Sequence, residues 1–256
     1  MRIFVNFQVY LSFAAVLLIL GPLAIAAGAE APTPVFVELF TSEGCSDCPP
    51  ADAFLRQMDG QPIAGVELIV LEEHVDYWDD QGWKDPFSSH EWTVRQSEYA
   101  QRMHVKAPYT PQMIVDGTDQ FVGNDTHKAG AAVQSAIAEG TLTTQISGIK
   151  ADRGKVVAHI ETGAAPGNAE VFVAFALDHA ETQVQRGENG GKKLEHVAIL
   201  RSLRKVGKVK KGESFADDVN LSTDLSGQPG RMIVFVQESN LGRIVGAAME
   251  AIPSQP

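Results

Sequence analysis

The chain has 256 residues, with 21 lysines and arginines against 32 aspartates and glutamates, which gives a formal net charge of −11 at pH 7. Because so acidic a protein repels phosphate backbones and anionic lipid headgroups, the charge argues against nucleic acid and anionic membranes as partners. The length suits one large domain or two modest ones. Only two cysteines are present, so any disulfide or thiolate chemistry must use that one pair.

The first residues have the pattern of an export signal. Arg2 supplies a positive start, an apolar run follows over residues 11–20, and small residues suited to cleavage come at 24–29. An uncleaved membrane anchor is the alternative, since the apolar run can be extended nearly to the length of a spanning helix. We therefore predict a signal peptide over residues 1–29 and a periplasmic or secreted mature protein, in a compartment where a disulfide can persist.

Strand-like and helix-like patterns alternate over residues 30–140. Pro49 and Pro50 suit the first turn of a helix, where a missing N–H group costs little. The second strand is apolar apart from Glu67, and this run is continuous enough to predict a central position parallel to the first strand. In chain order the expected elements are a strand at 35–40, a helix from 49 to about 60, a strand at 66–71, a helix at 92–103, strands at 112–116 and 120–122, and a helix from about 125 to 139. This is the element order of a thioredoxin-like α/β domain.

Strand patterns separated by Gly, Asn and Asp turns dominate residues 141–256. The alternation is clearest over residues 170–177, and residues 194–203 fit a helix equally well. We therefore expect a second, mostly antiparallel domain that resembles a β-sandwich. Its predicted strands lie at 142–149, 155–161, 169–178, 196–206, 231–238 and 243–251.

The two cysteines, Cys45 and Cys48, lie where the first strand gives way to the first helix. The N-terminus of a helix favours a thiolate, so Cys45 is the expected nucleophile and Cys48 the thiol that resolves a mixed disulfide. The neighbouring acids Glu43 and Asp47 oppose a thiolate. A plain structural disulfide and a metal site are the alternatives, although so short a loop gains only about 2 kcal/mol from chain entropy.

Two further residues extend the candidate redox centre. Pro111 directly precedes the third predicted strand, where a cis-proline belongs in a fold of this element order, and Thr110 would present its backbone to a substrate. An ordinary trans turn proline is the alternative. Glu38 is the one charged residue in the first strand, and as a buried acid it would assist proton transfer to Cys48. The alternative for Glu38 is a side chain that faces solvent.

A long aromatic and acidic loop follows the second strand, over residues 74–87. Tyr77 and Trp78 in this loop are expected to pack as a hydrophobic lid, with stacking on a substrate as the alternative. With Thr110, they are the candidate substrate-binding residues.

His74 leaves the second strand at the sheet edge where Cys45 leaves the first. Two cysteines and one histidine suit Cu(I) or Zn(II), so Cys45, Cys48 and His74 form an alternative metal site. A histidine held by a nearby acid such as Asp76 or Asp79 is the simpler explanation.

Several of these segments together resemble the secreted, thioredoxin-like domain-of-unknown-function 1223 family. They are residues 35–50, 74–85, 109–112 and the turn at 187–191. The resemblance implies a thioredoxin-like fold with a redox-like centre and names no substrate. Ser46 and Asp47 replace the Gly-Pro pair of thioredoxin itself, and Pro49 follows the second cysteine directly. The redox potential and the direction of reaction therefore stay open.

Three functions follow from these observations. The first is thiol–disulfide exchange at Cys45 and Cys48 on exported proteins or small thiols, with no cofactor and with a membrane-bound redox protein as a candidate partner. The second is Cu(I) or Zn(II) binding, or copper delivery, by Cys45, Cys48 and His74. The third is an envelope protein without catalytic activity, in which the disulfide is structural.

Overall fold

The computed structural model describes residue 1, residues 31–223 and residues 225–253. The predicted signal peptide, residues 1–29, lies outside this range except for Met1. No helix in the described part of the chain has both the length and the apolar character needed to cross a membrane.

Helices and strands follow the predicted order through residue 140. In order along the described chain, the elements are β1 (Thr33–Thr41), α1 (Pro49–Gly60), β2 (Val66–His74), α2 (His90–Arg102), β3 (Gln112–Val115), β4 (Asp119–Val122), α3 (Thr126–Glu139), β5 (Thr144–Asp152), β6 (Lys155–Thr162), β7 (Ala169–Gln183), β8 (Lys193–Val209), β9 (Ala216–Ser222), β10 (Gly230–Glu238) and β11 (Ile244–Ala251). Strand β9 has no counterpart in the prediction. The segment 194–203, which fitted a helix equally well, lies in strand β8.

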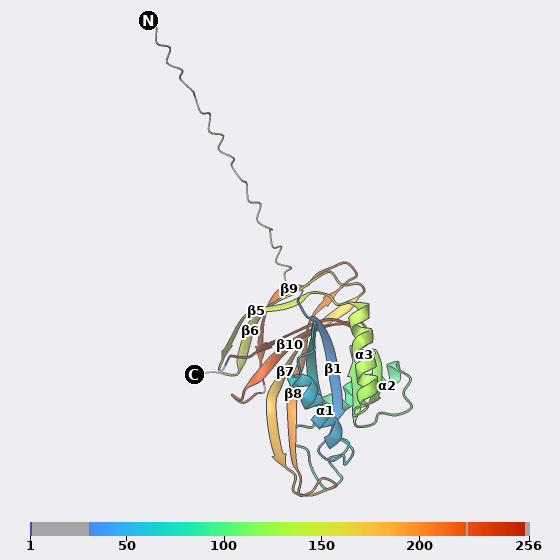
Figure 1. Ribbon diagram of the computed structural model, residues 1–256. Helices are drawn as coiled ribbons and strands as arrows, with labels where there is room; N and C mark the ends of the chain where they lie inside the picture. Colours follow the sequence, from blue (N-terminus) through green and yellow to red (C-terminus); the bar gives the residue numbers. More distant parts are fainter. Residues whose placement is uncertain (2–30, 224, 254–256) are drawn as a thin grey trace. The chain divides into compact units, whose positions relative to one another are not determined.

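Strands from both halves of the chain form one mixed sheet of eight strands, in the order β11-β10-β7-β8-β2-β1-β3-β4 (Figure 1). The first two strands are parallel, as predicted. The two halves join where β8 pairs with β2 in parallel at Ile199 and Glu72. Strands β5, β6 and β9 form a separate antiparallel sheet.

The predicted fold class, a thioredoxin-like α/β domain followed by a β-sandwich-like domain, is therefore wrong. Strands β7, β8, β10 and β11 extend the sheet of β1 and β2 and do not build a separate sandwich. Hydrophobic alternation indicates that a strand exists, but the strand to which it pairs is set by contacts far apart in sequence. The domain boundary at residue 140 remains a prediction.

Residues 171–177 of strand β7 are apolar on both faces, and this fits their place inside the large sheet. Val173 and Phe175 belong to the core shared with β6 of the smaller sheet. Ala174 and Ala176 point to the other face and pack in the core that contains Phe36 of β1. A strand buried on both faces is typical of a covered central position and not of the outer layer of a sandwich.

The large sheet curls so that distant strands meet. The rings of Phe36 in β1 and Phe235 in β10 have centroids 4.8 Å apart, although three strands lie between β1 and β10 in the sheet order. The amide of Ile244, at the start of β11, donates to the carbonyl oxygen of Asp116 at 2.8 Å.

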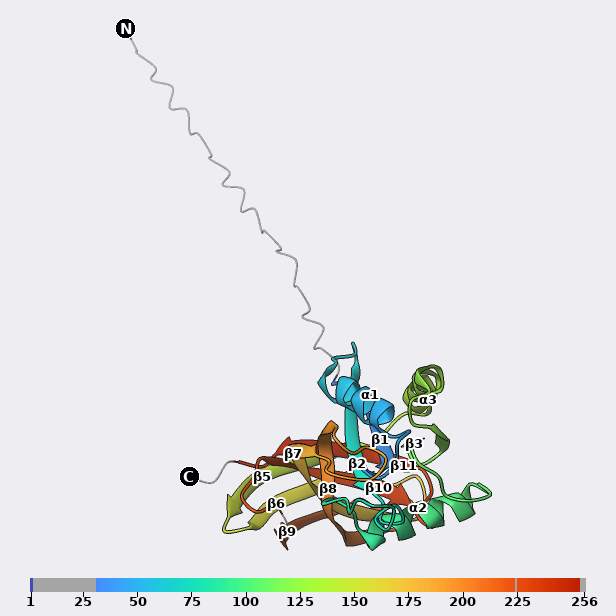
Figure 2. The same cartoon turned by 90° about the horizontal axis from the view of Figure 1, so that it is seen from below.

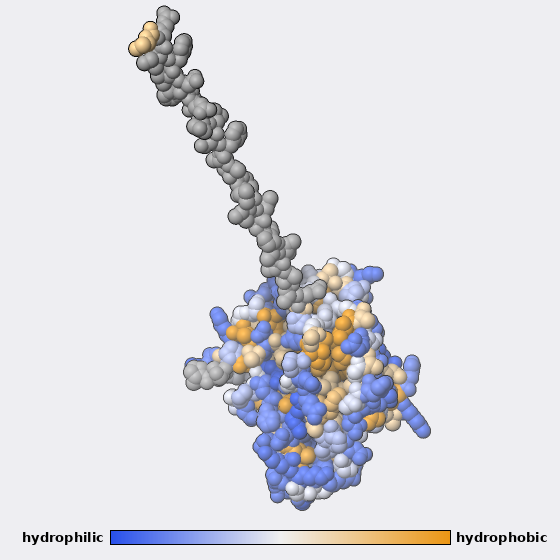
Figure 3. Space-filling view, in the orientation of Figure 1, coloured by the Kyte–Doolittle hydropathy of each residue, from blue (hydrophilic) through white to orange (hydrophobic). Residues whose placement is uncertain are grey.

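Helices α1 and α3 cover one face of β1 and β3, and α2 lies on the opposite face (Figure 2). Between α1 and α3 is an apolar groove of about 210 Å³ lined in part by Phe54, Met58 and Val133. The space-filling view shows apolar surface over this region (Figure 3). Helix α1 thus packs one side onto the sheet. Its first turn follows the segment from Cys45 to Cys48, called the CxxC turn below, which lies at the edge of the sheet.

Candidate functional site

Cys45 and Cys48 are joined in a disulfide, with their Cα atoms 5.5 Å apart. Cys48 is the N-cap of α1, and its carbonyl oxygen accepts the amides of Ala51 and Asp52. Pro49 follows in the first helical turn, as predicted. Both cysteines are almost fully buried, with exposed fractions of 1% for Cys45 and 0% for Cys48. The disulfide thus lies at a helix N-terminus but under other parts of the chain.

The loop between β7 and β8 covers the CxxC turn. The side-chain amide of Asn189 donates to the carbonyl oxygens of Glu43 and Cys45, each at 2.9 Å. The amide of Ser46 donates to Glu188 Oε2 at 3.1 Å. Asn189 is fully buried, whereas Glu188 is exposed. Both residues lie in the turn at 187–191, which contributes to the family resemblance, but no role at the site was predicted for them, because the loop is more than 140 positions away in sequence.

The aromatic loop after β2 lies beside the same turn. A side chain at Gly44 would come within 2.9 Å of Trp78 Cβ, so only a glycine fits there without rearrangement. The indole N–H of Trp78 donates to Thr110 Oγ1 at 2.8 Å. The hydroxyl of Tyr77 donates to Gln96 Oε1 at 3.2 Å, and the Tyr77 side chain is partly exposed. The predicted substrate-binding residues Trp78 and Thr110 are therefore in contact, and a substrate-binding role for them remains a prediction.

The peptide bond between Thr110 and Pro111 is cis, as predicted. Pro111 lies close to the first turn of α1, because a side chain at Gly123 would meet both Ala51 and Pro111. The structure thus brings Pro111 to the helix that carries Cys48, and its catalytic role remains a prediction.

Glu38 lies on the sheet face that α2 covers, whereas α1 lies on the other face. Its carboxylate accepts Arg95 Nε at 2.8 Å and the Tyr99 hydroxyl at 2.7 Å. Glu73 also approaches Arg95, and burial together with the charge of Glu38 holds the pKa of Glu73 well above its usual value. No hydrogen bond or ion pair within the described residues joins Glu38 to Cys48. The expected proton transfer between them therefore has no supporting contact.

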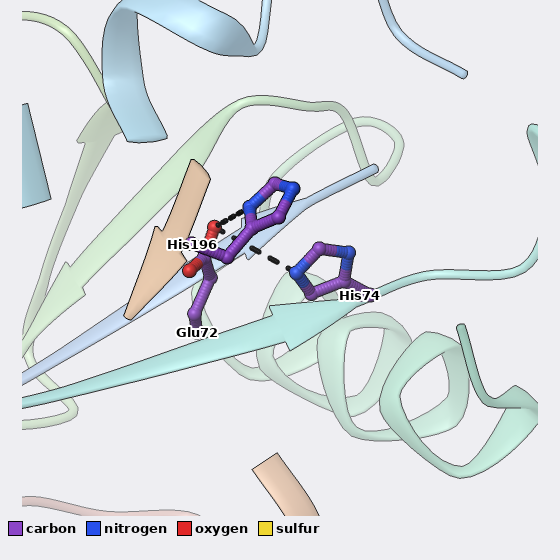
Figure 4. A group of neighbouring side chains, drawn as sticks. All are labelled: Glu72, His74 and His196. Carbon is purple, nitrogen blue, oxygen red and sulfur yellow. Dashed lines mark hydrogen bonds and ion pairs between the residues drawn. The ribbon is translucent and has the colours of Figure 1, made fainter. Parts of the chain in front are cut away.

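A second buried polar group lies on the α1 face, where β2 meets β8. Glu72 and His74 alternate on β2, so they point to the same face, and His196 comes from β8 (Figure 4). Glu72 Oε1 is 2.8 Å from His196 Nδ1 and 3.6 Å from His74 Nε2. The rings of the two histidines have centroids 4.7 Å apart, and all three residues are fully buried.

Carboxylates also face the outer nitrogens of both histidines. His74 Nδ1 lies 2.7 Å from Asp85 Oδ2, and His196 Nε2 lies 3.3 Å from Glu43 Oε1. Asp85 Oδ2 also accepts the amide of Glu43 at 2.8 Å. The carboxylate of Glu43 in turn accepts the indole N–H of Trp83 at 2.7 Å. Glu43 therefore links the CxxC turn to this buried group.

Asp52, one turn into α1, completes the group. It is buried, and its Oδ1 accepts the Thr41 hydroxyl at 2.6 Å. Burial, reinforced by the nearby charge of Glu72, raises the pKa of Asp52 to about 7. Burial lowers the pKa of His196, but the charge of Glu72 and hydrogen bonds with Glu43 and Glu72 outweigh it, so the pKa lies well above the usual value.

Of Glu72, His74 and His196, only His74 was predicted as a candidate site residue. The simpler explanation for His74 was a nearby acid such as Asp76 or Asp79, whereas the partner is Asp85, and Asp76 binds Thr93. A usable signal was present, since β2 ends in three ionisable residues at 72–74 directly after an apolar run. His196 could not be placed because its strand pairing is long-range.

The alternative metal site of Cys45, Cys48 and His74 is not assembled in this structure. The two sulfur atoms are bonded to each other. Among the described residues, the side chains whose potential metal-ligand atoms cluster are Glu72, His74 and His196.

Comparison with known proteins identifies a family of unknown function and similar solved structures. The profile of the family described as "Protein of unknown function (DUF1223)" matches residues 36–237. An X-ray crystal structure of a protein from Agrobacterium tumefaciens is similar with a TM-score of 0.68 and 27% sequence identity, over 89% of this chain and 97% of that one. HBP35 of Porphyromonas gingivalis is similar with a TM-score of 0.61 and 14% identity, over 88% and 76% of the two chains, which concerns the fold alone. No curated protein matches the chain.

Proposed function

Because the chain belongs to the DUF1223 family, whose function is unknown, we propose its function from the geometry of the site. The protein carries out thiol–disulfide exchange through Cys45 and Cys48 on exported proteins or small thiols. The observation that carries this proposal is the position of the bond: the disulfide closes at the N-terminus of α1, with Cys48 as the N-cap. Helix N-termini stabilise a thiolate there, and a thiolate is the attacking species in exchange.

The exchange step follows from the two sulfurs. In the reduced protein, the Cys45 thiolate attacks a substrate disulfide, a Cys45–substrate bond forms, and the substrate's other sulfur leaves as a thiolate that takes up a proton. Cys48 then loses its proton and attacks the Cys45 sulfur, which releases the substrate as a dithiol. The substrate gains two electrons and the protein loses two, which yields the disulfide of this structure. A dithiol reductant returns the protein to its starting state.

Access to the sulfurs requires movement of the loop between β7 and β8. Asn189 and Glu188 of this loop bind the backbone on either side of Cys45, and the disulfide is buried beneath. Release of these hydrogen bonds therefore precedes attack on either sulfur. The N-terminal signal pattern supports export, and an oxidising compartment suits a persistent disulfide.

Trapping of mixed disulfides tests this function. The Cys48→Ser variant keeps the nucleophile and lacks the resolving thiol, so it is expected to accumulate mixed disulfides with a model disulfide substrate. The matched Cys45→Ser variant is expected to accumulate few. Equal trapping by the two variants would contradict the assigned roles. Absence of trapping by both, with a loss of stability alone, would favour a purely structural disulfide.

A further inference from the structure

We propose that Glu72, His74 and His196 bind one divalent transition-metal ion, for which Zn²⁺ is the probe. This site lies on the α1 face of the sheet and does not use the cysteines, so it goes beyond the exchange function. The ligand atoms are His74 Nε2, His196 Nδ1 and Glu72 Oε1 (Figure 4). Two imidazoles and one carboxylate form a ligand set that Zn²⁺ and other first-row ions accept.

The spacing of these atoms suits a metal ion. Ligand atoms about 2.0–2.2 Å from a tetrahedral Zn²⁺ lie about 3.3 Å from one another. Glu72 Oε1 is 2.8 Å from His196 Nδ1 and 3.6 Å from His74 Nε2. All three ligand atoms lie within 4.8 Å of one another, so adjustments of the side chains would bring them to this spacing.

Carboxylates lie behind both histidines, as in known metal centres. His74 turns its other nitrogen to Asp85 at 2.7 Å in a hydrogen bond, whereas His196 turns its other nitrogen toward Glu43 at 3.3 Å without one. Metal-binding histidines usually donate their second N–H to such a carboxylate, which fixes the ring and the tautomer. The second oxygen of Glu72 accepts the amide of Val197 at 2.9 Å, so Oε1 is left to face the two rings.

The charge of the buried group also favours a cation. The group contains the carboxyl groups of Glu43, Glu72, Asp85 and Asp52 and only two imidazoles. Because a metal-bound imidazole is neutral, a divalent ion would supply the same two positive charges that two protonated imidazoles supply in its absence. An unpaired buried charge is strongly unfavourable, so the group needs one source of positive charge or the other.

Unpartnered polar atoms supply an independent observation. His74 Nε2 makes no hydrogen bond to any residue in the described part of the chain, although its residue is fully buried and the atom faces Glu72. Asp52 Oδ2 is also buried without a hydrogen-bond partner. Buried polar atoms are normally satisfied, so these atoms need an explanation, and a bound ion provides one for His74.

The other buried polar group contains its own cation, although the two carboxylate oxygens of Glu73 there have no hydrogen-bond partner among the described residues. There, Glu38 is paired directly with Arg95 and accepts the Tyr99 hydroxyl. The cation of that group is the side chain of Arg95. Glu72 faces two histidines in place of an arginine, and histidine is the side chain that binds metal ions most often.

Metal content after refolding tests the proposal. Because the site is buried, the disulfide-bonded protein is unfolded in guanidinium and refolded with one equivalent of Zn²⁺ or with a chelator, and bound zinc is then measured by mass spectrometry. We expect one Zn²⁺ per chain, and a higher unfolding midpoint with Zn²⁺ than with the chelator. The Asp85→Asn variant is expected to keep the fold and to bind Zn²⁺ roughly 10- to 100-fold more weakly.

Two variants of matched chemistry sharpen the test. His196→Gln removes a ligand, whereas His159→Gln removes an exposed histidine that also lies between two carboxylates, Asp218 and Glu161. Loss of binding in His196→Gln alone supports the site. Equal binding in both variants, or no stoichiometric zinc in the refolded wild type, would overturn it.

X-ray absorption of the zinc-loaded wild type gives a readout that needs no variant. A first shell of nitrogen and oxygen with imidazole scattering supports the site, whereas sulfur ligands would overturn it in favour of the cysteines. Zinc binding by a Cys45→Ser/Cys48→Ser variant separates this proposal from the exchange function. The metal site is expected to persist in that variant, in which exchange is abolished.

Discussion

The side-chain amide of Asn189 donates a 2.9 Å hydrogen bond to the carbonyl oxygen of Cys45, a residue 144 positions earlier in the chain. The same amide also binds the carbonyl oxygen of Glu43. Two such bonds together contribute about 1–3 kcal/mol to closure of the loop over the disulfide. We therefore expect Asn189→Ala to speed reduction of the disulfide by dithiothreitol roughly tenfold, as measured by the release of free thiols.

An asparagine elsewhere on the protein provides the control for this prediction. Asn220 is exposed on β9, in the smaller sheet, so Asn220→Ala should leave the rate of reduction unchanged. An Asn189→Ala rate equal to that of the wild type would show that this loop does not limit access to the disulfide.

The ion pair of Glu38 and Arg95 should stabilise the fold through its burial. Both side chains are almost completely inaccessible, and Glu73 also lies 3.6 Å from Arg95. Arg95→Met keeps much of the packing but leaves buried carboxylates without their cation, and we expect it to lower the free energy of unfolding by about 3–5 kcal/mol. Urea denaturation measures this change.

The double variant Arg95→Met/Glu38→Gln tests the cause of that loss. The second substitution removes the uncompensated charge. The double variant should therefore lose less unfolding free energy than the two single variants lose in sum. Arg153→Met is the surface control, since the Arg153–Asp152 pair is exposed, and little change is expected. Additive losses in the double variant would mean that the pair does not act as a unit.

Local sequence patterns were sufficient to predict most individual elements. The expected strand at 66–71 became β2 at Val66–His74, and the expected helix at 92–103 became α2 at His90–Arg102. The order of the strands in the sheet was not predictable from local patterns. The two halves of the sheet are joined by the pairing of β2 with β8 at Glu72 and Ile199, and hydrophobic periodicity does not indicate which strands pair.

The candidate site divides in the same way. Cys45 and Cys48 were found because their spacing is a local signal, and the cis bond at Pro111 because this proline directly precedes the third expected strand. No role at the site was predicted for Asn189 or His196, since they reach it only through the pairing of β7 and β8 with the rest of the sheet. Residues that contact the site from distant segments require the fold to be known first.

Asp116 should make stability depend on pH. Its side chain is buried and accepts the amide of Phe36 at 2.7 Å. Burial, only partly opposed by that hydrogen bond and by the charge of Arg243, raises its pKa from 3.8 to about 7. Between these values the folded protein binds more protons than the unfolded chain, so this group's contribution to stability falls as pH rises from about 4 to about 7 and is constant above that.

Asp116→Asn removes this titration and keeps the hydrogen-bond acceptor for Phe36. Asn also tolerates the positive φ of 43° at this position. The free energy of unfolding of the wild type, minus that of the variant, should fall by at most about 4 kcal/mol between pH 4 and pH 8. Urea denaturation at both pH values measures it, and other titrating groups cancel in the difference. A difference that does not change with pH would place the pKa of Asp116 in its ordinary range.

The turn after β3 should tolerate only glycine at position 117. Gly117 has a φ of +68°, and a side chain there would come within 2.6 Å of the carbonyl oxygen of Gly242. Gly154, in the turn between β5 and β6, has a similar φ of +74° but no neighbouring atom within 4 Å of the added carbon. The two positions therefore share the backbone strain and differ in the steric overlap.

Alanine at each position separates these two effects. Gly154→Ala should lower the free energy of unfolding by about 1–2 kcal/mol, from the left-handed backbone alone. Gly117→Ala should lower it by about 1–3 kcal/mol more, because the opposing atom belongs to the backbone and cannot rotate away. Chemical denaturation of both variants measures the difference. Equal losses would show that the segment around Gly242 moves to make room, and the contact between that segment and the β3 turn would then be weaker than its distance implies.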